Sequence, residues 1–233
     1  MYTVSALWTT LISTTGHWFE TKVNIAGTGY GQNKIISLSV NRRLFTGEQP
    51  SVGGCLSAEI DLTMLAPSSA VPRMAQITPY ARVCAGSQQS EWIPQGVYFL
   101  DTREVTDNND GLNILTLHGY DAMLKAEADY PNTTHDWPMS DIAVVNEIAS
   151  TIGVSVDART TALMTADYSI GLPAGYSMRE VLSNIAGMYA GNWVMGLDGA
   201  LLLVPINSYP DETRLLVTAA GEPITFGGDR ILV

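Results

Sequence analysis

Residues 56–64 read Leu-Ser-Ala-Glu-Ile-Asp-Leu-Thr-Met, a segment in which apolar and polar side chains alternate without a break. Successive side chains of a β-strand point to opposite faces, so this alternation gives an extended chain one apolar face and one polar face. A helix would scatter the same polar residues around its circumference. The segment therefore predicts a half-buried strand, with a β-sheet at the centre of the fold.

Five more segments in the first half of the chain have strand character. They are residues 19–25, 36–40, 76–84, 96–105 and 112–118. The last two flank Asp110-Gly111, a pair that tolerates the positive φ angles of a hairpin turn, so these two strands are expected to pair antiparallel. We predict that residues 1–125 form a six-stranded antiparallel sheet that closes into a β-barrel or a sandwich.

Helical signals follow the last of these strands. Asp121 and Lys125, four residues apart, favour a short helix over residues 120–128. Further on, Ser140 and Gly153 are suited to begin and end a helix with an apolar face.

A second such helix begins with the capping box Ser177-Met178-Arg179-Glu180 and is expected to stop at Gly191. Two strands, residues 192–196 and 200–206, follow with a turn at Leu197-Asp198-Gly199 between them.

Residues 138–206 are therefore predicted to form a small helix-helix-hairpin α+β unit. The tail, residues 207–233, contains turn signals and one apolar run, and we expect it to return to the β domain or to begin a second barrel. The predicted fold class is mainly β with an α+β insertion.

The composition limits the classes of partner. The 233 residues are 46% hydrophobic and only 15% charged, which leaves open either apolar surface for a partner or a large core under a Ser/Thr/Asn-rich surface. The net charge is −11, and the only adjacent basic pair is Arg42-Arg43. Sequence-independent DNA binding requires clustered Lys and Arg, so it is not expected. An acidic wall would instead let DNA pass without sticking.

The sequence also bears on the compartment. The N-terminus lacks the basic start and apolar core of a signal peptide, and no run approaches the roughly 20 apolar residues of a membrane helix. Cys55 and Cys84 could pair, but two buried thiols in a chain made in a reducing cytoplasm are expected.

A search for metal ligands and phosphate loops finds no site. His17, His118 and His135 stand in unrelated settings without ligand spacing. Asp107–Gly111 resembles a calcium loop, but its glycine is misplaced and the final Glu ligand is absent, so a hairpin turn is expected. Gly27–Gly31 could suggest a phosphate-binding loop, but a strand pattern follows it, so a flexible loop between strands is expected.

No nucleophile elbow, zinc-protease helix or Cys-His arrangement is present. Glu59 and Asp61 share one face of a strand, as the carboxylates of a glycosidase could, but that face is the polar one and is expected to be solvated. We predict no enzyme activity and no catalytic, cofactor-binding or metal-binding residue.

Four segments together resemble the hub proteins of bacteriophage tails. Residues 92–101 and 115–124 are similar to the family's aromatic strand and to its strand ending in Gly-Tyr-Asp. Residues 52–60 and 177–204 are similar to its Gly-Gly strand entry and to its Arg-Glu helix with the following Trp and Asp-Gly hairpin. The four matches occur in the family's order and span about residues 50–206.

This resemblance implies a tail-tip or baseplate hub subunit with a β-barrel domain and a small α+β insertion. It implies a homotrimer that caps the tail tube, with the tail tube or distal tail protein ring and further tip proteins as partners, and a place in the virion tail after assembly in the bacterial cytoplasm. In the family two barrels per subunit give pseudo-sixfold symmetry, whereas only one full barrel is evident here before Ile206.

Two other functions are compatible with the residues. A carbohydrate-binding module for host cell-surface recognition could use Trp8, Trp18, Trp92 and Trp137, since aromatic rings stack on sugars, although such rings more often pack. A cell-wall hydrolase is a third possibility, because some tail-tip proteins carry such a domain further along the chain.

Overall fold

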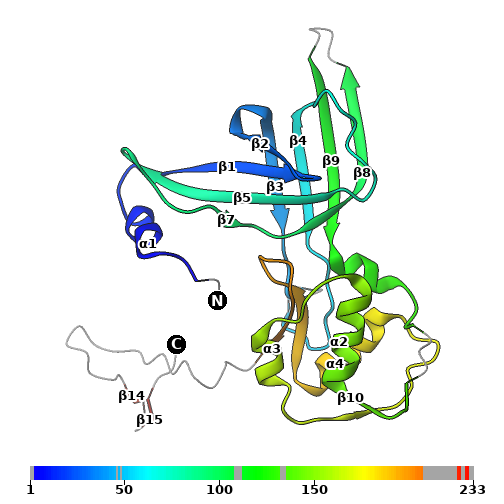
Figure 1. The fold of residues 1–233 in the computed structure, drawn as a ribbon. Coiled ribbons are helices and arrows are strands. Elements are labelled where there is room, and N and C mark those ends of the chain that lie inside the picture. The colour runs from blue at the N-terminus through cyan, green and yellow to red at the C-terminus, as the bar shows by residue number, and fades with distance from the viewer. Residues whose placement is uncertain are drawn as a thin grey trace.

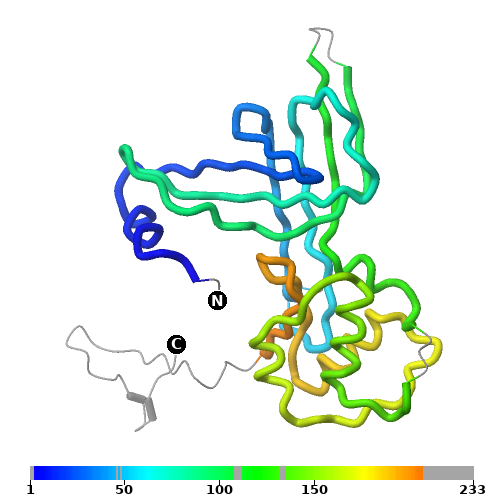
Figure 2. Tube along the Cα trace, viewed as in Figure 1, coloured from blue at the N-terminus to red at the C-terminus, as the bar shows by residue number. Residues whose placement is uncertain are grey.

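The computed structural model describes residues 3–45, 47, 49–107, 112–131 and 135–206, and the backbone of residues 225–226 and 229–230. The chain forms a β part, which ends at Asp121, and a smaller α+β part after it (Figure 1). Each part has its own cluster of buried apolar side chains. Figure 2 shows that the chain near residue 50 leaves the β part, passes through the α+β part and returns.

The β part is one antiparallel sheet whose strands pair in the order β2-β1-β5-β8-β9-β4-β3. Two short strands, β6 and β7, also pair with β5. The elements are β1 (Trp18–Ile25), β2 (Thr28–Gly31), η1 (a 3-10 helix, Gln32–Lys34), β3 (Ile35–Asn41), β4 (Glu59–Leu65), β5 (Gln76–Ala85), β6 (Gln88–Gln89), β7 (Ile93–Pro94), β8 (Tyr98–Asp107) and β9 (Asn113–Asp121). All six predicted strands are present, and the mainly β fold class is confirmed.

The sheet bends sharply between β5 and β8. These two strands pair only where Gln76 meets Phe99 and Ile77 meets Tyr98, whereas β5 pairs with β1 along the whole of β1. As a result the half β2-β1-β5 crosses the half β8-β9-β4-β3 at a steep angle (Figure 1). The core lies between the two halves and includes Val23, Ile25, Ile60, Leu62, Met64, Ile77, Leu115 and Leu117. The arrangement is sandwich-like, with two crossed layers.

The described strands do not close into the barrel that the sequence left open as an alternative. Closure would require hydrogen bonds between the end strands β2 and β3, and these two strands do not pair. The chain leaves strand geometry between them, at η1. The glycine-rich segment 27–31, which we expected to be a loop, instead forms part of the turn and the second strand of the β1–β2 hairpin.

A short helix not predicted from the sequence precedes the sheet. It is α1 (Ala6–Ile12), capped by Ser5, whose Oγ accepts a hydrogen bond from the Trp8 amide at 3.1 Å. Leu11 packs against Val83 and Ala85 of β5. Seven residues are too few for a helical period to stand out in a sequence.

Beyond Leu100, β8 pairs with β9 alone and forms the outer strand of the half-sheet; we call its residues 102–107 the β8 arm (Figure 1). All residues from Asp101 to Asp107 are exposed. A bulge between Leu100 and Thr102 separates the arm from the part of β8 that pairs with β5. The turn predicted at Asp110-Gly111 lies outside the described residues, but the antiparallel pairing of the two strands is as predicted.

Gly119 lies in β9 beside this bulge, where two strands approach closely. A Cβ atom added there would lie 2.6 Å from the Phe99 carbonyl oxygen and 3.4 Å from Ile60 Cγ2. The first contact is with backbone, which cannot move aside as a side-chain end could.

We therefore expect Gly119→Ala to lower the free energy of unfolding by about 1–3 kcal/mol, as overpacking does. Urea denaturation measures this change. The matched control is Gly187→Ala in a surface helix, where an added Cβ meets nothing within 4 Å and where alanine should, if anything, stabilise. Equal stabilities of the two variants would contradict the close approach at Gly119.

The α+β part agrees with the predicted helix-helix-hairpin unit and adds elements to it. It comprises η2 (Ala122–Glu127), β10 (Met139–Ser140), α2 (Asp141–Ile152), α3 (Ala158–Leu163), β11 (Ser169–Ile170), α4 (Met178–Met188), β12 (Gly191–Met195) and β13 (Leu201–Pro205). The apolar faces of α2 and α4 share one core with the hairpin β12–β13, and Trp193 is fully buried in it. The helix expected over residues 120–128 is the 3-10 helix η2, and α3 was not predicted.

The predicted helix ends are mostly correct. Ser140 caps α2, and Gly153 follows that helix in the left-handed conformation, with φ of 78°. The capping box of Ser177 and Glu180 is formed in full at α4. Gly191 does not stop α4, which ends three residues earlier, at Met188; instead it begins β12, where a Cβ would lie 2.8 Å from the Val204 carbonyl oxygen.

The predictions for residues 207–233 fall almost entirely outside the described residues. Within that tail the backbone of β14 (Thr225–Phe226) pairs antiparallel with that of β15 (Asp229–Arg230).

Candidate functional surface

One face of the half-sheet β8-β9-β4-β3 is polar and open to solvent. The registers of the four strands align their residues in rows, such as Thr102, His118, Asp61 and Ser39. The next row on the same face is Glu104, Thr116, Thr63 and Ser37. These eight residues and Glu59 are exposed or half-buried, and we call them the polar face. The opposite face of β4 and β9 supplies the core.

The charge of the polar face is acidic. It contains Glu59, Asp61 and Glu104, and none of its nine members is Lys or Arg. His118 Nδ1 lies 2.7 Å from Asp61 Oδ1, but the Asp61 side chain is 64% exposed, so this contact contributes little to stability. A phosphate backbone passing over this face would be repelled rather than bound.

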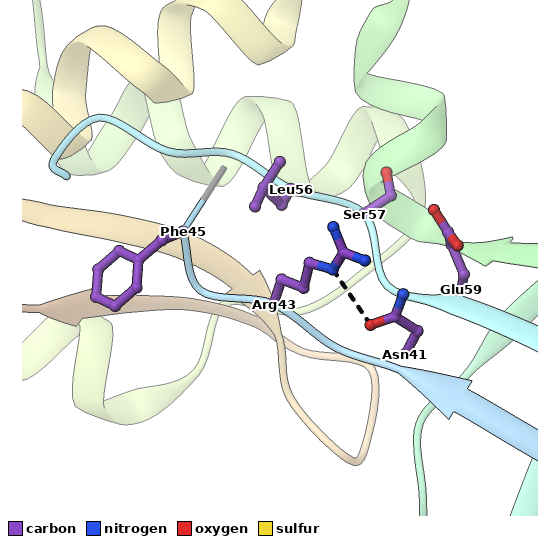
Figure 3. A pocket seen from close by; sticks show the side chains of 6 residues that line it. All are labelled: Asn41, Arg43, Phe45, Leu56, Ser57 and Glu59. Carbon is purple, nitrogen blue, oxygen red and sulfur yellow. Dashed lines mark hydrogen bonds between the residues drawn. The ribbon is translucent and has the colours of Figure 1, made fainter. Parts of the chain in front are cut away.

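Glu59 and Asp61, considered from the sequence as a carboxylate pair, lie on this polar face as expected. Glu59 also lines a shallow hollow where the β part joins the α+β part (Figure 3). The hollow is lined by Asn41, Arg43, Phe45, Leu56, Ser57 and Glu59. Arg43 Nε donates to Asn41 Oδ1 at 3.4 Å, and no histidine lines the hollow to act as a base for Ser57. The hollow thus offers polar contacts without a paired nucleophile and base.

The two cysteines are free and buried, as expected. Burial raises the pKa of the Cys55 thiol to about 12, and Cys55 Sγ packs 3.1 Å from Met123 Sδ. Burial also raises the pKa of Cys84. Because the thiolate is the reactive form of cysteine, both side chains are suited to packing rather than to nucleophilic chemistry.

The histidines stand apart, as their sequence settings indicated. His17 contacts the Thr14 carbonyl, His118 contacts Asp61, and His135 Nε2 lies 3.3 Å from Glu147 Oε1. Across the described ranges, no three His, Cys, Asp or Glu side chains gather as a metal site would require. In the same ranges no helix is both long enough and apolar enough to cross a bilayer.

The four tryptophans considered as sugar platforms differ in exposure and surroundings. Trp18 is 44% exposed, and the other three are half-buried. Lys22 Nζ and Arg82 Cζ lie 4.6 Å and 4.4 Å from the centre of the Trp92 ring. Trp8 packs beside Leu11, and Trp137 packs on the α+β core. Trp18 is therefore the ring most available for stacking.

Asp121, in the Gly-Tyr-Asp segment, forms buried hydrogen bonds at the junction of the two parts. Its Oδ2 accepts a hydrogen bond from the Ala58 amide at 2.8 Å, and its Oδ1 accepts one from the Met123 amide at 3.0 Å. Burial raises the pKa of this carboxyl to about 6, against the opposing effect of the two amides and of Arg42. The sequence predicted a helix at this position but not the buried cap.

Arg179, in the Arg-Glu segment, is a second residue whose side chain links elements at this junction. Its Nη2 donates to Ser57 Oγ and to the Met123 carbonyl, both at 2.9 Å, and its Nη1 lies 3.0 Å from Glu127 Oε1. One guanidinium group thus joins α4 to η2 and to the chain that leads into β4.

We expect Arg179→Met, which keeps the aliphatic stem, to lower the free energy of unfolding by about 1.5–3 kcal/mol, the usual effect of losing hydrogen bonds to a charged group. Thermal and urea unfolding measure the change. Arg103→Met, on the exposed arm, is the matched control and should change stability by less than about 0.5 kcal/mol. A loss no larger than that of the control would show that the guanidinium contacts do not hold the junction.

A segment from the β half of the sequence also pairs with the α+β part. Residues 51–55 lie beside β12: the Gly53 amide donates to the Gly191 carbonyl at 2.9 Å, and the Trp193 amide donates to the Gly54 carbonyl at 2.8 Å. Asn192 Nδ2 donates to the Ser51 carbonyl at 2.7 Å. The Gly-Gly segment is thus a partner of a hairpin that follows it by more than a hundred residues. No local pattern in the sequence signals this pairing.

The fold described above is similar to that of solved prophage tail proteins. The chain is similar to the prophage MuSo2 43 kDa tail protein of Shewanella oneidensis, with a TM-score of 0.55 and 13% identity over 86% of this chain and 59% of that one. It is also similar to a tail protein of Neisseria meningitidis MC58, with a TM-score of 0.52 and 12% identity over 86% of this chain and 55% of that one.

The chain therefore spans little more than half the length of these solved tail proteins. No family model and no curated protein matches the sequence. The likeness is to phage tail proteins, the class that the four sequence segments resemble.

Proposed function

We propose that this chain is a structural subunit of a phage tail tip or baseplate hub. In this proposal it forms a homotrimer that caps the tail tube, contacts the tail tube or distal tail protein ring, and connects it to the tip or fibre apparatus. Its place is the virion tail, after assembly in the bacterial cytoplasm. The fold shared with two prophage tail proteins is the observation that carries the proposal.

The polar face supports a role around a DNA channel. It is broad, continuous over four strands, acidic, and without Lys or Arg. A wall of this charge releases no counterions from DNA and so would not retain it. We expect no specific nucleic-acid binding, although DNA passes through the assembled ring.

The contacts described above favour an assembly role over enzyme activity. The paired carboxylates Glu59 and Asp61 lie on the solvent-facing polar face, the thiols are buried, and the hollow of Figure 3 lacks a base beside its serine. In particular, incubation with peptidoglycan should release no soluble fragments; release above a buffer control would instead support a cell-wall hydrolase.

Native mass spectrometry with negative-stain imaging tests the hub proposal. We expect a trimer and a ring with a central opening at micromolar concentration. A strict monomer throughout the accessible concentration range would count against the hub. A gel-shift assay with short duplex DNA should show no complex at 0.15 M salt, where a phosphate-binding protein would still bind.

The second candidate function is carbohydrate binding at the tail tip, and the exposed ring of Trp18 is what favours it. The covered rings of Trp92 and Trp137 count against it. A glycan array separates the two candidates: a hit that Trp18→Ala abolishes would favour the binding module, whereas an array without hits would dismiss it.

A further inference from the structure

The half-sheet β8-β9-β4-β3 has a free edge on each side. At one side, β3 pairs with β4 and with no other described strand. At the other side, β8 from Thr102 to Asp107 pairs only with β9. A free strand edge presents unpaired amide and carbonyl groups to any extended chain that can reach it.

The two free edges lie at the same level of the sheet. Following the registers across the four strands, Glu104 is level with Thr116, Thr63 and Ser37. In the same way Thr102 is level with Ser39. A second copy placed beside the first without a shift along the strands would therefore set its β8 arm against β3.

The strand directions also match. Each neighbouring pair in the order β8, β9, β4 and β3 is antiparallel, so β3 runs opposite to β8. Copies related by rotation about an axis along these strands would therefore meet as an antiparallel pair. Such a head-to-tail contact closes into a ring when the rotation closes.

Side chains at the two edges are compatible with this contact. From Ile35 to Asn41 the edge strand β3 carries no charge and no proline, the usual protections of an exposed edge. Val105 of the arm is 58% exposed and is level with Ile35, whose neighbour Ile36 is 55% exposed. Asp107 at the end of the arm would approach Lys34, which precedes β3.

We propose that the β8 arm of one copy, residues 102–107, adds as a strand to the free edge of β3 in a second copy, residues 35–41. The inference rests on the proposed oligomeric hub and names the surfaces that build it. The polar faces of successive copies then form one continuous acidic surface, and each copy uses both of its free edges.

A mixture of two cysteine variants tests the pairing. Ser37→Cys and Glu104→Cys are single, exposed substitutions that leave the core untouched. Directly opposite residues on one face of an antiparallel pair bring their Cβ atoms to about 4.5–5.5 Å, close to what a disulfide needs. Oxidation of the mixed variants should therefore give a covalent dimer on non-reducing gels, and the double variant should give a ladder of bands.

The chain offers clear controls. Within one copy the two positions are separated by three strand spacings, about 14 Å, so an internal disulfide cannot form. Each single variant oxidised alone should stay unlinked, because a head-to-tail contact never brings two identical positions together. Thr28→Cys on β2, the free edge of the other half-sheet, mixed with Glu104→Cys should also give no product.

The outcomes separate this inference from the hub proposal. Cross-linking of Ser37→Cys with Glu104→Cys, or of Ser39→Cys or Asn41→Cys at a shifted register, supports the pairing. An oligomer by light scattering in which none of these pairs cross-links, or in which Thr28→Cys does, overturns the pairing and leaves the hub standing. A strict monomer overturns both.

Discussion

Asp121→Ala is expected to lower the free energy of unfolding by about 2–6 kcal/mol, because it leaves two buried amides without acceptors at about 1–3 kcal/mol each. The carboxylate is 2% exposed and accepts hydrogen bonds from the amides of Ala58 and Met123. These amides belong to the segments that enter β4 and η2, so the loss falls on the junction of the two parts. Urea denaturation followed by tryptophan fluorescence measures it. A loss below about 1 kcal/mol would mean that solvent replaces the carboxylate.

The same carboxyl predicts a pH dependence. Its pKa is raised by burial from an ordinary 3.8 to about 6 in the folded protein. The folded state therefore holds this proton more tightly, and the group's stabilising contribution is complete below about pH 4 and is lost as the pH rises through 6. By this linkage the stability of the wild type relative to Asp121→Asn should fall by at most about 3 kcal/mol between pH 4 and 7.

The difference between wild type and Asp121→Asn is the quantity to follow, since the other titrating groups are common to both proteins. Paired urea curves at several pH values supply it. If the wild type instead gained stability relative to Asp121→Asn as the pH rises, the two amide hydrogen bonds would outweigh burial, and the pKa of Asp121 in the folded protein would lie below the ordinary value.

Trp193→Ala should have an effect of similar size, a loss of about 3–5 kcal/mol. The ring is fully buried in the α+β core, and its Nε1 donates to the Leu182 carbonyl at 2.7 Å. The substitution removes a large apolar volume and the hydrogen bond that the indole donates to that carbonyl. Trp193→Phe, which keeps most of the volume, should recover part of the loss. Trp18→Ala, at an exposed ring, is the matched control, and an equal loss there would contradict the central place of Trp193.

Local patterns in the sequence were sufficient for most elements. Alternation from Leu56 to Met64 located β4, and a serine before each main helix located the starts of α2 and α4. These signals act within a few residues, so they can be read without knowing the rest of the fold. Elements shorter than two helical turns, such as α1 and α3, give too few repeats for the same inference.

The arrangement of the elements depends on contacts that no local pattern encodes. The sharp bend follows from only two paired positions between β5 and β8, and it decides between a closed barrel and crossed layers. Part of the polar face could be predicted from the sequence, since Glu59 and Asp61 were expected to be solvated. The extent of this face across neighbouring strands could not be predicted, because it depends on the strand registers that place His118 and Thr116 on the same face. The hydrogen bonds of Asp121 and Arg179 at the junction of the two parts could be recognised only from the tertiary structure.

The pairing of residues 51–55 with β12 has a consequence for biosynthesis. During translation this segment emerges long before the hairpin that it will join, so it waits unpaired while the β part assembles around it. One side of β12 is completed by chain made much earlier, so the α+β part makes its full set of hydrogen bonds only together with residues 51–55. Nascent chains stalled before Asn192 would therefore lack the partners with which Gly54 and Ser51 form hydrogen bonds in the folded protein.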